Sequence, residues 1–496
     1  MQLPDHNIHT SVARPSMHFT PASGWINDPN GLIFYAGEYH LFYQHHPAAT
    51  VWGPMHWGHA VSRDLVHWEE LPIALAPDDI GAIFSGSAVL DRNNTAGFGA
   101  DAMVAIFTHD TNKPDQKQAQ SLAYSLDRGR TWTKYSGNPV LLPPVGQKNF
   151  RDPKVFWSDN GQQAHWVMAL AVATEIWFYR SANLKEWTMC SRFGADFGSH
   201  SGVWECPELI QLALEGTDER HWVLIVSVGN GAPAGGSGVQ YFVGQFDGAT
   251  FTPHEAPSQT RWADYGADFY APQAWNDAPD GRKLWLAWMN NWSYGNQIPD
   301  SGGWRGAMTM MRELSLRRDG QALVLIQRPV RELAGFHGQH QHWTMRQIDK
   351  AEIPIDLPLS SAQAETAPCQ SIHVVFRVAA STTAQRFGLL LRGQSGESVE
   401  IGYSIALSRL SVNRRTAGSG LSGFANPHHA ALSPRDDKIA LQILIDRTSI
   451  EIFADDGQLV MTEQVFLNPM VKSLALFAED GFVEVESLDC FQLGLH

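Results

Sequence analysis

Short apolar runs, some of them alternating with polar residues, fill most of the chain, and long amphipathic helical patterns are scarce. Gly, Asn and Asp separate these runs, as they separate the strands of hairpins. Near the N-terminus, residues 32–35 and 39–44 predict two strands joined by a short Ala-Gly-Glu turn. This pattern predicts an all-β fold.

A hairpin signature recurs along the first two thirds of the chain. It consists of a polar residue, then Asp or Asn, then a short spacer and an aromatic residue. Its four copies end, at similar intervals, at Trp68, Trp132, Trp187 and Phe251, and residues 318–323 form a degenerate fifth copy. Asp in such a turn bonds its own backbone two residues on, and the aromatic residue starts the outgoing strand. The repeat predicts a five-bladed β-propeller with about four strands per blade.

The pattern changes after residue 335. Residues 336–352 are polar and predict a linker between a propeller over 1–335 and a second domain over 353–496. Seven plainer strands without the repeat predict a β-sandwich for this second domain. The expected strands are Ser371–Val378, Arg386–Leu391, Lys438–Asp446, Ser449–Phe453, Gln458–Val465, Lys472–Phe477 and Phe482–Leu488.

Composition narrows the partners. The 496 residues carry a net charge of -15 and contain no block of five or more basic residues, which argues against nucleic acid and anionic membrane as partners. The 18 Trp residues suit strands and also suit stacking on the apolar faces of sugars. The N-terminus lacks a signal-peptide pattern and no apolar run is long enough to span a membrane, so we expect a cytoplasmic protein, or a secreted one if a leader was trimmed.

No metal site is predicted. The four Cys residues lie far apart in sequence, and none forms a close-spaced ligand pair. His45, His46, His56 and His59 are the obvious additional candidates for a metal, but they lack a helical or Cys-paired context. We expect these histidines to pack or to form hydrogen bonds.

Candidate chemistry lies at one phase of the propeller repeat. Equivalent inner strands of a propeller surround one axis, so motifs at a similar phase of each blade converge on one site. Four of the five motifs carry a carboxylate, which permits either metal binding or acid/base chemistry. The five motifs are Asn27-Asp28-Pro29-Asn30, Phe84-Ser85-Gly86-Ser87, Arg151-Asp152-Pro153, Trp204-Glu205-Cys206-Pro207 and Asp268-Phe269-Tyr270-Ala271-Pro272.

The first motif has two interpretations. A segment this rich in Gly, Asn, Asp and Pro is commonly an ordinary turn. The Asp28 carboxylate, however, stands beside the Trp25 indole and the Asn27 amide, a combination that suggests sugar recognition. The convergence of five motifs favours the second interpretation.

These motifs resemble those of glycoside hydrolase family 32, the β-fructofuranosidases that include invertases, exo-inulinases and levanases. The resemblance extends from about Phe19 to the C-terminus. Further matching segments are Trp52-Gly53-Pro54-Met55-His56-Trp57-Gly58 and, in the second domain, Asp446-Arg447-Thr448-Ser449-Ile450-Glu451-Ile452-Phe453.

The resemblance implies roles for three carboxylates. Asp28 is expected to be the nucleophile, and Glu205 the general acid/base, with Trp204 and Cys206 excluding water around it. Asp152 is expected to stabilise the transition state through sugar hydroxyls, with the adjacent Arg151 keeping it ionised.

The resemblance also implies a substrate site without a metal or an organic cofactor. Asp268 is expected to hold the sugar beyond the terminal fructosyl unit. The remaining substrate-binding residues are expected to be Trp25, Asn27, Gln44, Trp52, Phe84, Ser85, Arg151 and Trp292.

The expected activity is that of a retaining, exo-acting β-fructofuranosidase on sucrose, fructooligosaccharides or fructans such as inulin and levan. A fructosyltransferase with the same site, an inverting arabinan-type hydrolase and an inactive fructan-binding protein remain possible. The sequence does not fix the preferred chain length. A homodimer formed with the help of the sandwich is a further expectation.

Overall fold

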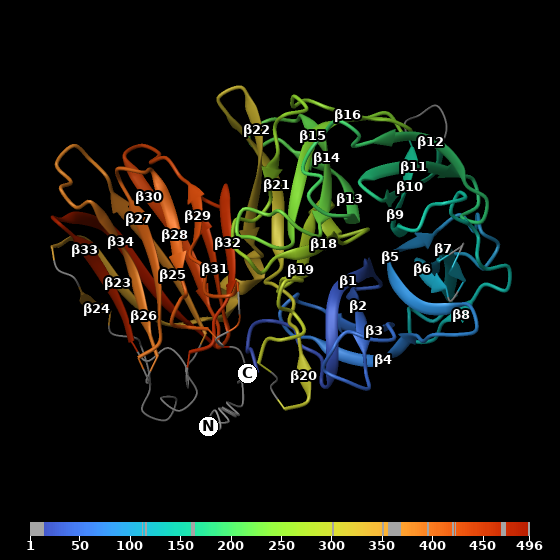
Figure 1. Cartoon of the computed structure of the whole chain (residues 1–496), viewed down its shortest axis with the longest axis horizontal. Helices are drawn as coiled ribbons and strands as arrows, with labels where there is room; N and C mark the ends of the chain where they lie inside the picture. The colour runs from blue at the N-terminus through green and yellow to red at the C-terminus, as the bar shows by residue number, and fades with distance from the viewer. Residues whose placement is uncertain are drawn as a thin grey trace, which may run out of the picture.

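The computed structural model forms two domains that lie side by side, and strands make up nearly all of their regular structure (Figure 1). Among the described residues, no helix is long and apolar enough to cross a membrane. Short 3-10 turns lie at Pro279–Gly281 and Arg331–Phe336. The described residues are 14–111, 113–114, 117–159, 164–299, 302–349, 352–355, 369–393, 396–418, 421, 423–467 and 473–494.

The first domain consists of five antiparallel sheets, the blades of a propeller, and it confirms the predicted fold. The first and second blades contain β1 (Gly24–Tyr35), β2 (Glu38–His46), β3 (His56–Ser62) and β4 (Glu69–Leu75), then β5 (Gly81–Asp91), β6 (Ala102–Thr111), β7 (Gln118–Ser125) and β8 (Thr133–Lys134). The third blade contains β9 (Phe150–Asp159), β10 (Ala164–Val172), β11 (Glu175–Ser181) and β12 (Thr188–Phe193).

The two remaining blades follow the same order, and one late strand returns to the first. The fourth blade contains β13 (Trp204–Ala213), β14 (Arg220–Val228), β15 (Gly238–Phe246), β16 (Phe251–Pro253) and β17 (Arg261–Trp262). The fifth contains β18 (Tyr270–Ala274), β19 (Leu284–Trp288), β21 (Arg312–Asp319) and β22 (Ala322–Pro329). The short strand β20 (Trp304–Arg305) pairs in parallel with β1. The segment between β19 and β21 of the fifth blade therefore contacts the first blade.

The first strand of every blade lies at the centre of the domain. β1 contacts β5, β5 contacts β9, β9 contacts β13, β13 contacts β18, and β18 contacts β1, which closes a ring. The predicted hairpin signatures form the turns between the third and fourth strands. In the first copy, the Asp64 carboxylate accepts hydrogen bonds from the backbone N–H groups of Val66 and His67, as expected of Asp in a turn. The degenerate fifth copy joins β21 to β22.

The second domain is a β-sandwich of two six-stranded sheets, with an apolar core between them. The first sheet has the order β23 (His337–Ile348), β34 (Val483–Leu493), β25 (Gln370–Arg377), β30 (Lys438–Ile445), β31 (Ser449–Ala454) and β32 (Leu459–Gln464). The second has the order β24 (Ile353–Ile355), β33 (Ser473–Glu479), β26 (Arg386–Arg392), β27 (Ser398–Ser404), β28 (Arg409–Asn413) and β29 (His428–Ala431).

All seven predicted sandwich strands are present, but the predicted linker is not. Residues 337–348 form β23, which pairs antiparallel with β34 at the edge of the first sheet. Most side chains of β23 are exposed, so its sequence shows no apolar pattern that would mark a strand. Four further strands, β24, β27, β28 and β29, were also missed.

A shared core and buried charges join the two domains. Apolar residues of both domains form one cluster, in which Phe19 and Leu41 of the propeller meet Leu444 and Phe453 of the sandwich. The sandwich segment noted for its family resemblance lies at this interface. Its Glu451 carboxylate, fully buried, accepts hydrogen bonds from propeller groups, which include the Arg312 guanidinium at 2.6 Å.

Candidate active site

The five inner strands share one irregularity near their N-terminal ends. The register of each strand with its neighbour shifts at the predicted motif, for example between Ile26 and Pro29 in β1. At three of the five motifs a residue adopts positive φ: 64° at Asp152, 46° at Cys206 and 52° at Ala271. Bulges of this kind re-aim side chains and are common next to active sites.

Alignment of the motifs on these bulges gives two sets of equivalent positions. Asp28, Ser85, Asp152, Cys206 and Ala271 occupy one position, and the residue before each forms the second set. The second set is Asn27, Phe84, Arg151, Glu205 and Tyr270. Hydrogen bonds between blades join members of both sets, so the predicted convergence on one axis is present in the structure.

Asp28 is a half-buried carboxylate with three side-chain donors. Ser85 Oγ donates to its Oδ2 at 2.7 Å, Cys206 Sγ donates to the same oxygen at 3.3 Å, and Asn27 Nδ2 donates to Oδ1 at 3.1 Å. Burial and the negative charge of Glu205 raise the pKa of Asp28, and the three donors act against that rise. The donors hold the carboxylate in place and favour its ionised, nucleophilic form.

Asp152 lies near Asp28 at the axis. Its Oδ2 accepts a hydrogen bond from the Cys206 backbone N–H at 3.0 Å and lies 3.8 Å from Arg151 Nε. Burial raises the pKa of Asp152 to about 7; Arg151 lowers it, and the charges of Glu205 and Asp28 raise it further. Arg151 therefore favours the ionised form of Asp152, as expected, but it acts against burial and two neighbouring carboxylates.

Glu205 binds two neighbours through its two oxygens. Its Oε1 accepts hydrogen bonds from Arg151 at 2.9 and 3.2 Å, and its Oε2 accepts one from the Tyr270 hydroxyl. Burial and Glu205 raise the pKa of Tyr270 well above its ordinary value, so this hydroxyl stays a donor. Trp204, which was expected to shield Glu205, packs instead in the core cluster of Phe242 and other apolar residues.

Cys206 connects two of the carboxylates. Its Sγ lies 3.3 Å from Asp28 Oδ2 and 3.6 Å from Asp152 Oδ2. Burial and the nearby carboxylates raise the pKa of the thiol well above its usual range, so it remains a protonated donor. Cys206 adjoins Glu205 in the sequence, a position that gives no sign of this bridge to Asp28 and Asp152.

Aromatic rings surround the carboxylates. Trp25 and Trp288 are fully buried, and the Trp292 ring stacks near Trp25 with a centroid distance of 6.4 Å. Trp52 is 44% exposed, and its ring meets the Phe84 ring edge-on at 6.1 Å. The site thus combines buried rings with an exposed indole, a combination that suits a sugar with one apolar face.

The Gln44 side chain supplies a polar group without a protein partner. Gln44 is buried on β2, and among the described residues its Nε2 has no hydrogen-bond partner. A buried amide without a partner is costly, so its N–H group suits a ligand hydroxyl.

Asp268 has a different place from the one expected. Its carboxylate is fully buried and accepts hydrogen bonds from the sandwich residues Arg414 at 2.5 Å and Gln464 at 2.8 Å, and from the Tyr294 hydroxyl at 2.7 Å. Its two oxygens are bound by these donors at the interface between the domains. The residue of this motif that reaches the site is Tyr270, two positions later.

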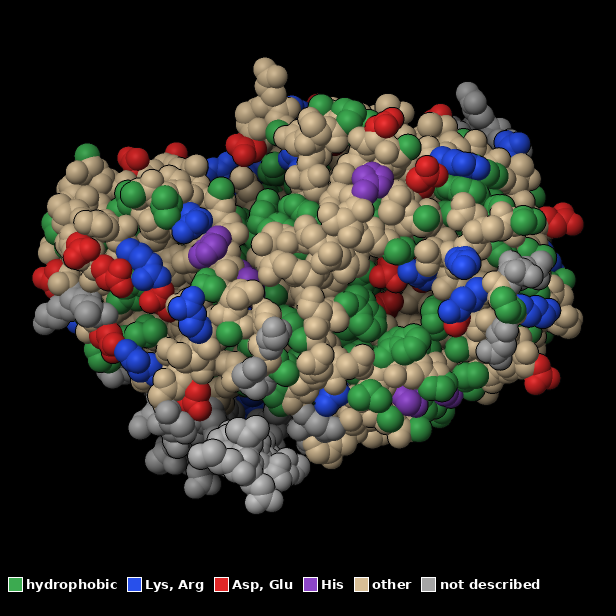
Figure 2. Space-filling view, viewed as in Figure 1, with side chains coloured by type: hydrophobic (Ala, Val, Ile, Leu, Met, Phe, Trp, Pro, Cys, Tyr) green, Lys and Arg blue, Asp and Glu red, His purple; other side chains and the backbone are tan. Residues whose placement is uncertain are grey.

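The propeller face is hollowed near its centre. Acidic side chains lie in this hollow with basic side chains beside them, and hydrophobic side chains surround it (Figure 2). Asp28, Asp152 and Glu205 each accept hydrogen bonds from protein donors, an arrangement that favours acid/base chemistry over metal ligation. A hydrogen-bonded carboxylate placed as a nucleophile and a second carboxylate beside a hydrogen-bonded cation are the parts that retaining glycosyl transfer requires.

Comparison with known proteins agrees with this arrangement. The model of the glycosyl hydrolases family 32 N-terminal domain matches residues 18–329, and the model of the family 32 C-terminal domain matches residues 341–492. The levanase of Bacillus subtilis is 46% identical over 493 residues, which cover 98% of this chain and 71% of the levanase.

Solved structures show the same architecture. An exo-inulinase from Aspergillus awamori superposes with a TM-score of 0.89 at 34% identity and covers 98% of this chain and 99% of its own. A β-fructofuranosidase from Schwanniomyces occidentalis, complexed with fructosyl-erythritol, superposes with a TM-score of 0.88 at 34% identity and 98% coverage of both chains. The chain belongs to glycoside hydrolase family 32.

Proposed function

We propose that this chain is a retaining, exo-acting β-fructofuranosidase that releases terminal fructose through a covalent fructosyl-enzyme. One observation carries the proposal. Asp28, Asp152 and Glu205 come from three different inner strands and meet at one end of the propeller, where Cys206 bridges Asp28 to Asp152 and Arg151 contacts both Asp152 and Glu205.

In the first step, an Asp28 oxygen attacks C2 of the terminal fructosyl unit while the bond from C2 to the glycosidic oxygen breaks. Glu205 in its protonated form gives its proton to the departing oxygen. The hydrogen bonds from Ser85 and Asn27 hold Asp28 in place for this attack.

In the second step, a water molecule attacks C2 and the bond between C2 and Asp28 breaks. Glu205, now a carboxylate, takes the proton from the water, which returns both residues to their starting states. Arg151 and the Tyr270 hydroxyl keep Glu205 in one orientation through both steps.

Asp152 is proposed to bind sugar hydroxyls. Its pKa near 7 in the free protein means that both protonation states are present at neutral pH. Hydroxyl groups of a bound fructosyl unit donate hydrogen bonds to Asp152 and so favour its ionised form. These hydrogen bonds strengthen as positive charge develops on the fructosyl ring, which stabilises the transition state.

Buried apolar side chains next to the carboxylates support exo-action. Trp25, Trp288 and Met55 are fully buried and pack with Cys206, so apolar side chains fill the space behind the carboxylates. A site closed on one side accepts the end of a sugar chain. The relatives are named levanase and exo-inulinase, and structures of the Schwanniomyces occidentalis enzyme contain fructose and fructosylnystose, which supports sucrose, fructooligosaccharides and fructans as the substrate class.

Initial rates of fructose release from sucrose, kestose, inulin and levan test the proposal. We expect wild type to release fructose and Asp28→Ala to lose nearly all activity, whereas the exposed control Asp79→Ala keeps the wild-type rate. Undiminished release by Asp28→Ala would overturn the nucleophile assignment. In methanol, a retaining enzyme forms methyl β-fructoside, and an inverted product would favour the arabinan-type mechanism.

Two further outcomes would point to a different function. Oligosaccharide products longer than the substrate at the expense of free fructose would show a fructosyltransferase, in which a sugar replaces water in the second step. Sugar binding without product would show an inactive binding protein. The homodimer and the cytoplasmic location stay predictions; light scattering and cell fractionation test them.

A further inference from the structure

Strand β23 carries two histidines on one face, at the edge of the first sandwich sheet. His340 and His342 are two residues apart, so their side chains project to the same side of the strand. Asp489 on the neighbouring strand β34 is the direct cross-strand partner of His342. Three ligating side chains therefore come together on the sandwich surface, far in sequence from the catalytic motifs.

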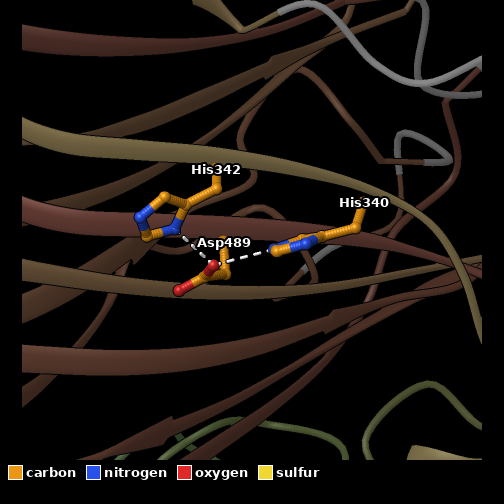
Figure 3. Close-up of side chains that lie close together, drawn as sticks. All are labelled: His340, His342 and Asp489. Carbon is orange, nitrogen blue, oxygen red and sulfur yellow. Dashed lines mark hydrogen bonds and ion pairs between the residues drawn. The ribbon is translucent and has the colours of Figure 1, made fainter.

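The three side chains meet at one oxygen atom. His340 Nε2 lies 2.8 Å and His342 Nδ1 lies 2.7 Å from Asp489 Oδ1. The two imidazole rings lie on either side of the carboxylate, with a ring nitrogen of each turned toward it (Figure 3). One ligand atom from each residue lies within 4.8 Å of the others.

We propose that His340, His342 and Asp489 form a surface site for one Zn²⁺ ion. Two imidazole nitrogens and one carboxylate oxygen match the ligand preference of zinc, with the fourth position left to water. Zinc bonds of about 2.0–2.2 Å place tetrahedral ligand atoms about 3.4 Å apart, so each nitrogen needs to move away from the oxygen by only about 0.6 Å. Mg²⁺ and Ca²⁺ prefer shells of oxygen ligands and do not fit this set.

Stacking prepares one ligand for the metal. The His340 ring lies parallel to the Phe491 ring at a centroid distance of 4.3 Å and an interplanar angle of 5°. Phe491 is the cross-strand partner of His340 and also stacks on His337 at 4.1 Å. The ring plane of His340 is therefore held by the sheet, which lowers the entropic cost of ligation.

The three ligating side chains are accessible from solvent. The three side chains are partly exposed, at 42% for His340, 48% for His342 and 28% for Asp489, so an ion reaches them from solvent without a change in fold.

A bound ion would tie an edge strand to its neighbour. β23 is the outermost strand of its sheet, and its far side has no strand partner in the described sheet. An ion that binds only the folded state stabilises it by mass action. We therefore expect zinc to raise the thermal unfolding midpoint without changing catalysis, because none of the three residues contacts the candidate active site.

Calorimetric titration of the tag-free protein, both domains included, with ZnCl₂ tests the site, with His340→Ala and Asp489→Asn as site variants. His254→Ala is the matched control, because His254 and His221 form another close histidine pair, with their nitrogens 3.2 Å apart. We expect one Zn²⁺ per chain in wild type and in the control, and at least about tenfold weaker binding in each site variant.

A thermal scan gives a second measurement. Zinc should raise the unfolding midpoint of wild type and of His254→Ala but not of His340→Ala, and MgCl₂ should raise none of them. Three results would overturn the proposal: no zinc bound by wild type, undiminished binding in both site variants, or loss of binding in the His254→Ala control.

Discussion

The Asp268 carboxylate of the propeller lies 2.5 Å from Nη1 of Arg414 in the sandwich, and both side chains are fully buried. Arg414 also pairs with the buried Glu463 at 3.1 Å. Asp268 stands two residues before Tyr270, whose hydroxyl binds Glu205. The sandwich domain therefore supports the position of the proposed acid/base residue, although none of its described side chains bonds to the three carboxylates.

Replacement of Arg414 by Met should damage both stability and catalysis. The change leaves Asp268 and Glu463 buried without their cation, and breaking a buried ion pair from one side costs about 3–5 kcal/mol. We expect a lower urea midpoint and a kcat that falls more than KM rises, because Tyr270 loses its support. Urea unfolding and steady-state kinetics on sucrose measure the two effects.

The neighbouring Arg415 offers a matched control, since it is exposed. Arg415→Ala should keep the wild-type midpoint and kcat. An Asp268→Asn variant with unchanged stability and a strongly raised KM would instead restore Asp268 to the sugar-binding role that the sequence suggested.

Ser85 should control the acidic side of the pH profile. Burial and Glu205 raise the pKa of Asp28, and the Ser85 hydroxyl opposes this rise by donating to Asp28 at 2.7 Å. Without that donor the pKa of Asp28 rises further, so Ser85→Ala needs a higher pH to ionise its nucleophile. A hydrogen bond to a charged group contributes about 1.5–3 kcal/mol, which predicts an upward shift of about one to two pH units.

The measurement is kcat/KM as a function of pH for wild type and Ser85→Ala. The alkaline limb of the same profile serves as the internal control. An acid limb that stays in place or moves to lower pH would show that Asp28 does not set this limb.

Short sequence motifs explain why the propeller and the three carboxylates could be predicted. The Asp turn, the following aromatic residue and the proline motif are short patterns, and they recur once per blade, so both the propeller and the convergence of Asp28, Asp152 and Glu205 could be inferred. The place of Tyr270 in the site could also have been predicted, because Tyr270-Ala271-Pro272 aligns with Glu205-Cys206-Pro207.

Features that depend on distant partners could not be inferred. The role of Asp268 depends on Arg414, which is far away in sequence and comes from the other domain. Strand β23 carries mainly exposed polar side chains, so only its pairing with β34 at the other end of the domain reveals it. The Cys206 bridge depends on the positive φ of 46° at that residue, which aims its side chain between two carboxylates.

His18 should make stability depend on pH. Its ring lies 2.8 Å from both Asp446 and Glu451. Burial acts to lower the pKa of His18, but these carboxylates outweigh burial and raise it to about 9, above the ordinary 6.5. Protonated His18 therefore stabilises the fold fully below about pH 6.5, and this contribution disappears as the pH rises through about 9.

A His18→Gln variant isolates this contribution. We expect it to be less stable than wild type at pH 6, by a free energy on the order of 2–3 kcal/mol, and the difference to shrink toward pH 9. Urea midpoints of both proteins at several pH values provide the comparison. A difference that is constant between pH 6 and pH 9 would mean that the charge of His18 is not involved.

Trp52 should bind substrate without supporting the fold. Its ring is 44% exposed beside Phe84, and its backbone N–H donates to Asn296 at 2.9 Å, which holds the loop in place. A stacking aromatic ring contributes about 0.5–1.5 kcal/mol, so Trp52→Ala should lower kcat/KM by up to about tenfold. Its thermal midpoint should stay close to that of wild type, because an exposed ring buries little area.

Trp157 provides the matched control for Trp52. It is 37% exposed and lies on β9 five residues beyond Asp152, toward the opposite end of the inner strand. Trp157→Ala removes the same side chain at a similar exposure but should leave kcat/KM unchanged on sucrose and kestose. Of the two rings, only that of Trp52 contacts Phe84, which packs beside Cys206 at the site. Equal losses of kcat/KM in the two variants would therefore show that the loss in Trp52→Ala does not come from sugar stacking.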